Sequence, residues 1–185
     1  MAKYTYRASS PALVTTGTAT KSFAAIIGSA TKRVIVTRIR ISCPTTTSVA
    51  YGTINVCKNS TATATPGQTL TCVPLNALYP TATGAAYTWT ADQTVGTLVG
   101  IVDSWRVLLQ STTAAASGVP DYHVFTFGDV TSGHMETEMN VNRTSGIVLN
   151  SAAEELSLQW QATVAAAATL AVSFEWVEES TGLGI

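Results

Sequence analysis

Charged side chains are scarce in this chain. They make up 11% of its 185 residues, whereas about a quarter is usual in soluble domains. The ten basic and eleven acidic residues nearly cancel and leave a net charge of −1. The chain as a whole therefore has no electrostatic footprint for nucleic acid, and we expect no nucleic-acid partner.

Long apolar runs are also missing. No stretch approaches the roughly 18 to 20 apolar residues that a membrane helix needs. The first residues, "MAKYTYRASSPALV", lack the apolar core of a secretory signal. We therefore expect no membrane partner and a protein made in a cytoplasm. The length fits one domain with a sizeable core.

Cysteine is rare, and its spacing excludes the common uses of the thiol. Cys43, Cys57 and Cys72 are far apart, and no C-x-x-C pair occurs. An odd number of cysteines without a secretory signal argues against a disulfide framework. A zinc site that also used His123 or His134 would normally show closely spaced ligand pairs. We interpret the cysteines as small apolar side chains and predict no metal and no cofactor.

Sequence motifs of catalysis are absent as well. The chain has no G-x-S-x-G, no H-E-x-x-H, no P-loop and no dinucleotide fingerprint. Glu136 and Glu138 would point the same way on a strand, whereas a glycosidase needs two carboxylates across a cleft. Asp121, His123 and His134 are interpreted as ordinary polar residues of loops and strand edges. We predict no catalytic residues and no enzyme activity.

What the sequence does have is alternation of apolar and polar residues. Residues 156–164 and 170–176 both alternate with a period of two, which puts their large side chains on one face of a strand. The alanines at 165–168 favour a helix by composition, but the flanking alternation predicts two strands joined there as a hairpin. The turn lacks Gly, Pro, Asn and Asp and is weakly specified. Another sheet must cover the apolar face of the hairpin.

The same alternation recurs along the chain. In "KRVIVTRIRIS", residues 32–42, the predicted strand places Ile35, Thr37, Ile39 and Ile41 on one face, which Arg33 begins at the strand edge. Val34, Val36, Arg38 and Arg40 lie on the other face. Residues 97–109 fit either a strand or a short helix. Further strands are predicted at residues 48–58, 69–75, 85–91, 122–128, 134–141 and 146–150.

This pattern predicts an all-β fold. About eight or more short antiparallel strands separated by turn-forming residues indicate a β-sandwich or barrel, and we predict a sandwich. Residues 21–185 form its single domain, and residues 1–20 are predicted to be an extended N-terminal arm. The other interpretation of residues 1–20 is terminal disorder.

Five residues are predicted to contact other proteins. Arg38 and Arg40 share one strand face, either as a solvated face whose charges prevent aggregation or as a dock for an acidic protein surface. Tyr4, Tyr6 and Leu13 would anchor the arm on a neighbouring subunit, because aromatic side chains contribute strongly to interfaces.

Three stretches resemble a family of tailed-bacteriophage virion proteins. They are "VIVTRIRIS", "VCKNSTATATPGQTLTCVPL" and "NSAAEELSLQWQ…LAVSFEWVEE", and the shared features fall on residues 37–41, 58–75 and 156–179. The resemblance implies a jelly-roll-like β-sandwich on the outside of the capsid, where it acts as a decoration or cement protein. This chain departs from the family at a loop where paired glycines are common and only Gly67 is present.

The resemblance also implies partners and a location. Such proteins bind the major capsid protein, commonly as homotrimers at local three-fold positions, and reach the virion surface after assembly in the host cytoplasm. The family has no catalytic motif to transfer. An alternative function is a tail or receptor-binding module that binds host carbohydrate. Its stacking platforms would be Tyr87, Trp89, Trp105 and Tyr122, while Trp160 and Trp176 belong to the core.

Overall fold

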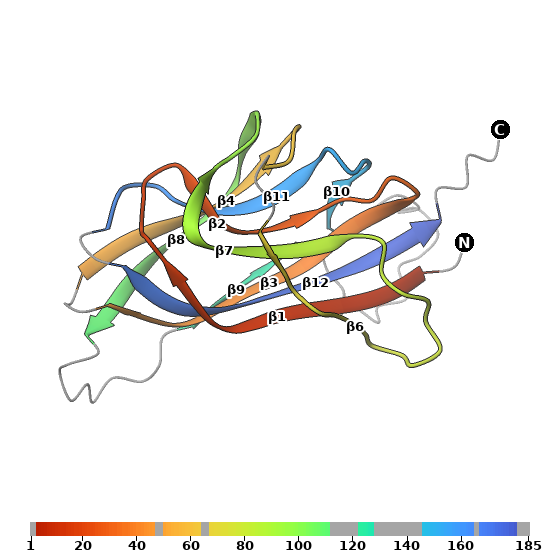
Figure 1. Cartoon of the computed structure of the whole chain (residues 1–185), viewed down its shortest axis with the longest axis horizontal. Coiled ribbons are helices and arrows are strands. Elements are labelled where there is room, and N and C mark those ends of the chain that lie inside the picture. Colours follow the sequence, from red (N-terminus) through yellow and green to blue (C-terminus); the bar gives the residue numbers. More distant parts are fainter. Residues whose placement is uncertain are drawn as a thin grey trace, which may run out of the picture.

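The chain folds into two β-sheets packed face to face (Figure 1). The computed structural model describes residues 3–46, 50–63, 67–111, 122–127, 146–164 and 167–180. These described residues form twelve strands and no helix. The predicted all-β sandwich is therefore confirmed, and residues 97–109 are a strand rather than a helix.

Sheet A contains the strand order β6-β1-β12-β3, with β9 and β10 both paired to β3 on its other side. All of these pairings are antiparallel. The strands of this sheet are β1 (Lys3–Thr15), β3 (Lys32–Thr46), β6 (Cys72–Pro74), β9 (Tyr122–Thr126), β10 (Ile147–Leu149) and β12 (Ala168–Ser180).

Sheet B has the strand order β5-β7-β2-β11-β4-β8, and its pairings are also antiparallel. A short parallel pairing between Thr45–Thr46 of β3 and Gln110–Ser111 of β8 joins the two sheets at one edge. The strands of this sheet are β2 (Lys21–Ile27), β4 (Ala50–Asn59), β5 (Gln68–Thr69), β7 (Ala85–Thr94), β8 (Leu98–Ser111) and β11 (Glu155–Trp160).

The core lies between the sheets and is rich in aromatic side chains. Trp160 and Trp176 are fully buried, as predicted. Their indole N–H groups donate to Thr15 Oγ1 at 2.9 Å and to Glu178 Oε1 at 3.2 Å, so neither polar atom is left unpaired. Burial of each large apolar side chain contributes about 1.5–3 kcal/mol. The other largest fully buried residues are Tyr6, Phe23, Phe125, Phe174, Ile26, Ile39, Ile41, Ile54, Leu109 and Leu149.

The predicted C-terminal hairpin is wrong in its pairing, although both of its strands exist. β11 pairs with β2 and β4 in sheet B, whereas β12 pairs with β1 and β3 in sheet A. The segment between them therefore crosses from one sheet to the other. Because no turn residue pins the two strands together, each pairs with other strands, and their apolar faces cover each other across the core.

The predicted N-terminal arm is corrected as well. Residues Lys3–Thr15 are not separate from the fold but form β1, which pairs with β12 on one side and with β6 on the other. Tyr6 and Leu13 are buried in the core of their own chain. These side chains were expected to anchor a neighbouring subunit. They instead pack in the core of their own chain, because the pairing of β1 with β12 turns the apolar face of β1 towards the opposite sheet.

A β-bulge in β3 changes the predicted faces of that strand. Glu175 of β12 lies opposite Arg38, but the next residue, Trp176, lies opposite Val36, so Thr37 is the extra residue. The packed cluster between the sheets therefore takes Val34 and Val36 together with Ile39 and Ile41, whereas Ile35 and Thr37 are buried outside it. A uniform period of two had placed Ile35 and Thr37 with the later isoleucines.

Candidate functional site

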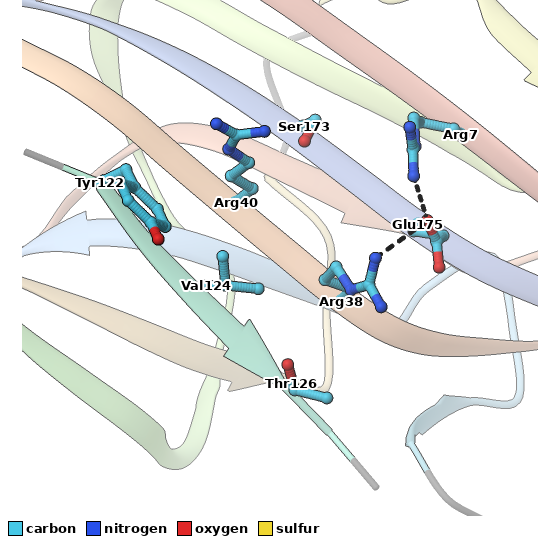
Figure 2. Close-up of a pocket in the computed structure, with 8 residues that line it drawn as sticks. All are labelled: Arg7, Arg38, Arg40, Tyr122, Val124, Thr126, Ser173 and Glu175. Carbon is cyan, nitrogen blue, oxygen red and sulfur yellow. Dashed lines mark hydrogen bonds and ion pairs between the residues drawn. The ribbon is translucent and has the colours of Figure 1, made fainter. Parts of the chain in front are cut away.

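An open groove of about 430 Å³ lies on the face of sheet A that points away from the core (Figure 2). Four adjacent strands supply its walls and floor, namely β1, β12, β3 and β9. Its lining residues are Arg7, Arg38, Arg40, Tyr122, Val124, Thr126, Ser173 and Glu175.

The strand register explains how these residues meet. Arg7, Glu175, Arg38 and Thr126 are direct cross-strand neighbours in one row. Ser173, Arg40 and Val124 form the next row of the same face, because alternate residues of a strand point to the same side. The groove is therefore built on backbone that is hydrogen-bonded on both sides of β12 and β3.

Ion pairs leave the groove with an excess of positive charge. One oxygen of Glu175, Oε2, lies 2.6 Å from Arg7 Nη2 and 3.8 Å from Arg38 Nη1. Arg40 has no carboxylate partner among the described residues, and its guanidinium carbon lies 5.5 Å from the ring centre of Tyr122. Three guanidinium groups against one carboxylate give the lining a net charge of +2.

The chemistry of this lining suits binding more than catalysis. The described part of the lining contains no histidine or cysteine, and its one carboxylate is held by two guanidinium groups. Guanidinium groups recognise carboxylates and phosphates through paired hydrogen bonds. The groove is therefore a candidate site for an anionic ligand.

The positive charge continues along the same face beyond the groove. Glu179 on β12 lies between Lys3 and Arg33, at 2.7 Å from Lys3 Nζ and 3.9 Å from Arg33 Nη1. Arg33 shares this face with Arg38 and Arg40 only because of the bulge at Thr37. Sequence alternation had placed it on the opposite face from those two arginines.

Of the five residues predicted to contact other proteins, only Arg38 and Arg40 come together on an open surface. Tyr4 is half-buried and meets Tyr79 edge to face, with their ring centres 5.2 Å apart. Sequence reasoning missed Arg7, because its place in the groove depends on β1 joining the sheet. The signal that pointed to it was the alternation of Tyr6, Arg7 and Ala8.

Other predicted candidates do not form an open site. Trp89 is only 5% exposed and Trp105 is stacked on His123, so neither is a free platform for a sugar. Tyr122, at 60% exposed, is the available ring of the predicted set, while Tyr87 is half-buried against Trp89. Asp121, His134, Glu136 and Glu138 lie outside the described residues.

The cysteines are consistent with their interpretation as apolar side chains where they are described. Cys57 is buried, and burial raises the pKa of its thiol to about 11. Burial also raises the pKa of Cys72, which is half-buried. The side chain of Cys43 is outside the described part of the structure. Within that part, no group of three or more His, Cys, Asp and Glu is arranged to hold a metal ion.

Two buried glutamates fix loops against the sheets. Glu178 accepts hydrogen bonds from Thr83 N at 2.8 Å, Thr83 Oγ1 at 2.9 Å and Gly84 N at 2.8 Å, and pairs with Lys32 Nζ at 3.1 Å. Burial alone would raise the pKa of Glu178, but the hydrogen bonds from Gly84, Thr83 and Trp176 outweigh it and lower the pKa below 4.5.

Glu155 makes the corresponding contacts on sheet B. It accepts from Thr63 N at 2.9 Å and from Thr63 Oγ1 at 2.9 Å. Asn59 Nδ2 donates to its Oε1 at 2.7 Å and also to Ser157 Oγ at 3.0 Å. Both oxygens of this carboxylate are thus used within the fold, which makes it a structural group rather than a ligand site.

An exposed apolar strand edge lies on sheet B. The first half of β8 leaves Leu98, Val99 and Ile101 exposed by 51%, 64% and 57%. On its other side β8 pairs with β3 only at its last two residues, so this half has no second strand among the described residues. Apolar edge strands of this kind readily contact other protein chains.

The chain matches no protein-family model, and no curated protein is similar to it. Within the described residues, no helix is long and apolar enough to cross a membrane. The features that bear on function are therefore the fold, the exposed edge of β8 and the basic groove.

Proposed function

We propose that this chain is a non-enzymatic structural protein of a tailed-bacteriophage virion, which binds the outside of the capsid lattice and stabilises the head. The observation that carries the proposal is the exposed apolar edge of β8. A solitary soluble protein rarely leaves such an edge uncovered, whereas in a lattice the neighbouring chains cover it. The resemblance of residues 37–41, 58–75 and 156–179 to virion proteins agrees with this function.

The strand order supports a jelly-roll arrangement, which is part of the proposal. In sheet A the order is β3-β12-β1-β6, and in sheet B it is β4-β11-β2-β7. Strands at corresponding positions in these two orders follow each other directly in the chain, as β3 and β4 do and as β11 and β12 do. Jelly rolls are common among viral capsid proteins, although a fold alone does not fix a function.

Assembly on a repetitive surface also explains the composition. Few charges and many small hydroxyl side chains give flat surfaces that pack against other proteins. Contacts of modest affinity suffice there, because several linked sites raise the effective concentration. In the proposal the protein acts as a homotrimer, and its partner is the major capsid protein.

The decisive experiment is cosedimentation with capsids built from the major capsid protein of the same phage. We expect the wild-type protein to bind and to sediment alone as a trimer. Ile101→Lys places a charge on the exposed edge of β8, where it should abolish capsid binding without unfolding the protein. Thr90→Lys is the matched control, because Thr90 is an exposed strand residue of the same sheet and lies on β7.

A wild-type protein that stays monomeric at micromolar concentration and does not bind these capsids contradicts the proposal. If wild type binds and Ile101→Lys binds equally well, the edge of β8 is not the contact.

A further inference from the structure

The groove on sheet A has a positive charge that the described residues do not neutralise. Arg7 and Arg38 share a single oxygen of Glu175, and the second contact is long at 3.8 Å. Arg40 forms no ion pair within the described part of the chain. The groove therefore has at least one guanidinium group available to an anionic ligand.

Arg40 is exposed but held in place. Its guanidinium group lies against the ring of Tyr122, and its direct cross-strand neighbours are Ser173 and Val124 (Figure 2). A cation–π contact orients the flat guanidinium group. Because less side-chain freedom is lost when a ligand binds to an oriented group, the contact favours binding.

The shape and size of the groove indicate which anion fits. Small-molecule sites are usually concave and mostly apolar, whereas this groove is open and lined by three arginines and three hydroxyl side chains. Nucleic acid requires a larger basic surface than a chain with ten basic residues and a net charge of −1 offers. The guanidinium groups of Arg7 on β1 and of Arg38 and Arg40 on β3 lie on either side of β12 and match an extended segment with acidic side chains.

We propose that the groove formed by Arg7, Arg38, Arg40 and Tyr122 binds the carboxylate side chains of an extended acidic peptide segment. The inference rests on the proposed function, in which this segment belongs to a protein of the capsid lattice. Arg40 forms the central contact by donating two parallel hydrogen bonds to one carboxylate. Arg38 and Arg7 then bind the next acidic side chain in competition with Glu175.

The test uses a fluorescein-labelled peptide of alternating glutamate and serine, added to the purified full-length protein and followed by fluorescence anisotropy. We expect saturable binding that weakens with added salt. Arg40→Gln should weaken it by about tenfold or more, because a charge-assisted paired contact is lost. An equally long peptide of glutamine and serine should not bind.

Arg106→Gln is the matched control. Arg106 lies on β8 of the other sheet, and its guanidinium carbon is 5.2 Å from the ring centre of Tyr51. It thus has the same kind of aromatic neighbour as Arg40 but does not line the groove. Binding by this variant should stay within about twofold of wild type. An equal loss in both variants would indicate unspecific charge attraction and overturn the inference.

Two further outcomes also overturn it: no binding of the glutamate peptide by wild type, and tighter binding of a single-stranded oligothymidine of equal length. Far-ultraviolet circular dichroism establishes that Arg40→Gln is folded. Capsid cosedimentation separates this inference from the proposed function. If wild type binds capsids but not the peptide, only the proposed binding of acidic peptides by the groove is refuted. If it binds the peptide but not capsids, only the proposed capsid role is refuted.

Discussion

Glu155 and Glu178 occupy corresponding positions in the two halves of the sandwich. Both side chains are fully buried, and each accepts hydrogen bonds from the backbone N–H and the hydroxyl of one threonine, Thr63 or Thr83. In each case the threonine belongs to a loop, so each glutamate fastens a loop to an interior strand of its sheet, β11 or β12.

The difference between them is the partner of the charge. Lys32 Nζ lies 3.1 Å from Glu178, and the backbone N–H of Gly84 and the indole of Trp176 also donate to it. Glu155 has only neutral donors among the described residues, chiefly Asn59. Glu178 is thus held by an ion pair and several hydrogen-bond donors, whereas Glu155 is held by neutral donors among the described residues. Removing the Glu178 carboxylate leaves the charge of Lys32 unpaired and more donors without an acceptor than removing that of Glu155.

The largest expected effect is that of Glu178→Ala. It leaves the half-buried Lys32 without its carboxylate and the N–H groups of Thr83, Gly84 and Trp176 without an acceptor. We expect a loss of about 3–5 kcal/mol in the free energy of unfolding, measured by urea denaturation. Glu154→Ala is the control, because its pair with Lys58 is partly exposed at 3.5 Å and contributes about 1 kcal/mol or less.

Glu155→Gln should have a smaller effect. The amide keeps the shape of the side chain but has one acceptor oxygen, so at least one donor of Thr63 or Asn59 loses its partner. The removal of a buried charge offsets part of this cost, and we expect a loss of about 1–3 kcal/mol. Urea denaturation measures it. A loss as large as that of Glu178→Ala would contradict the distinction between the two glutamates.

The dependence of stability on pH should reveal the buried charge of Glu178. Because the pKa of Glu178 is lower in the folded protein than its ordinary value of 4.5, its charge stabilises the fold above that value. This contribution is lost as the pH falls through the folded pKa. Between about pH 6 and pH 3, wild type should lose more stability than Glu178→Gln, by up to about 1.4 kcal/mol per pH unit. Parallel curves would contradict the lowered pKa.

The smallest effect is expected at Glu179, which follows Glu178 in the sequence but lies on the outer face of sheet A, where it is 7% exposed between Lys3 and Arg33. Its partner Lys3 is 68% exposed, so solvent screens the ion pair at 2.7 Å. Lys3→Gln should lower the free energy of unfolding by less than about 1 kcal/mol, and added salt should reduce the difference further. A loss near that of Glu178→Ala would show that the solvent exposure of an ion pair does not decide how much it contributes to the free energy of unfolding.

Much of the fold was predictable from local pattern. The alternation around Trp160 and Trp176 assigned both residues to strands and to the core, and the structure confirms both assignments. Arg38 and Arg40 were correctly placed together on one face. Such predictions succeed because the direction of a side chain on a strand depends only on neighbouring residues.

The rest of the candidate site depended on distant contacts. Arg7 joins the groove because β1 pairs with β12, across more than a hundred and sixty residues of sequence. Arg33 joins the same face because one extra residue, Thr37, shifts the alternation of β3. The alternation of Tyr6, Arg7 and Ala8 gives the face of Arg7 but not the strand beside it, and residues 32–42 carry no local signal for the bulge.

The sequence by itself determined that this protein is built of strands with one apolar face each, because a period of two is encoded residue by residue. Only the tertiary structure decided which strands are neighbours. β11 and β12 are adjacent in sequence but lie in opposite sheets. β1 and β12 are the first and last strands of the chain but are neighbours in one sheet. The physical reason is that strand pairing and core packing are interactions between distant segments, and many pairings would satisfy the same local alternation.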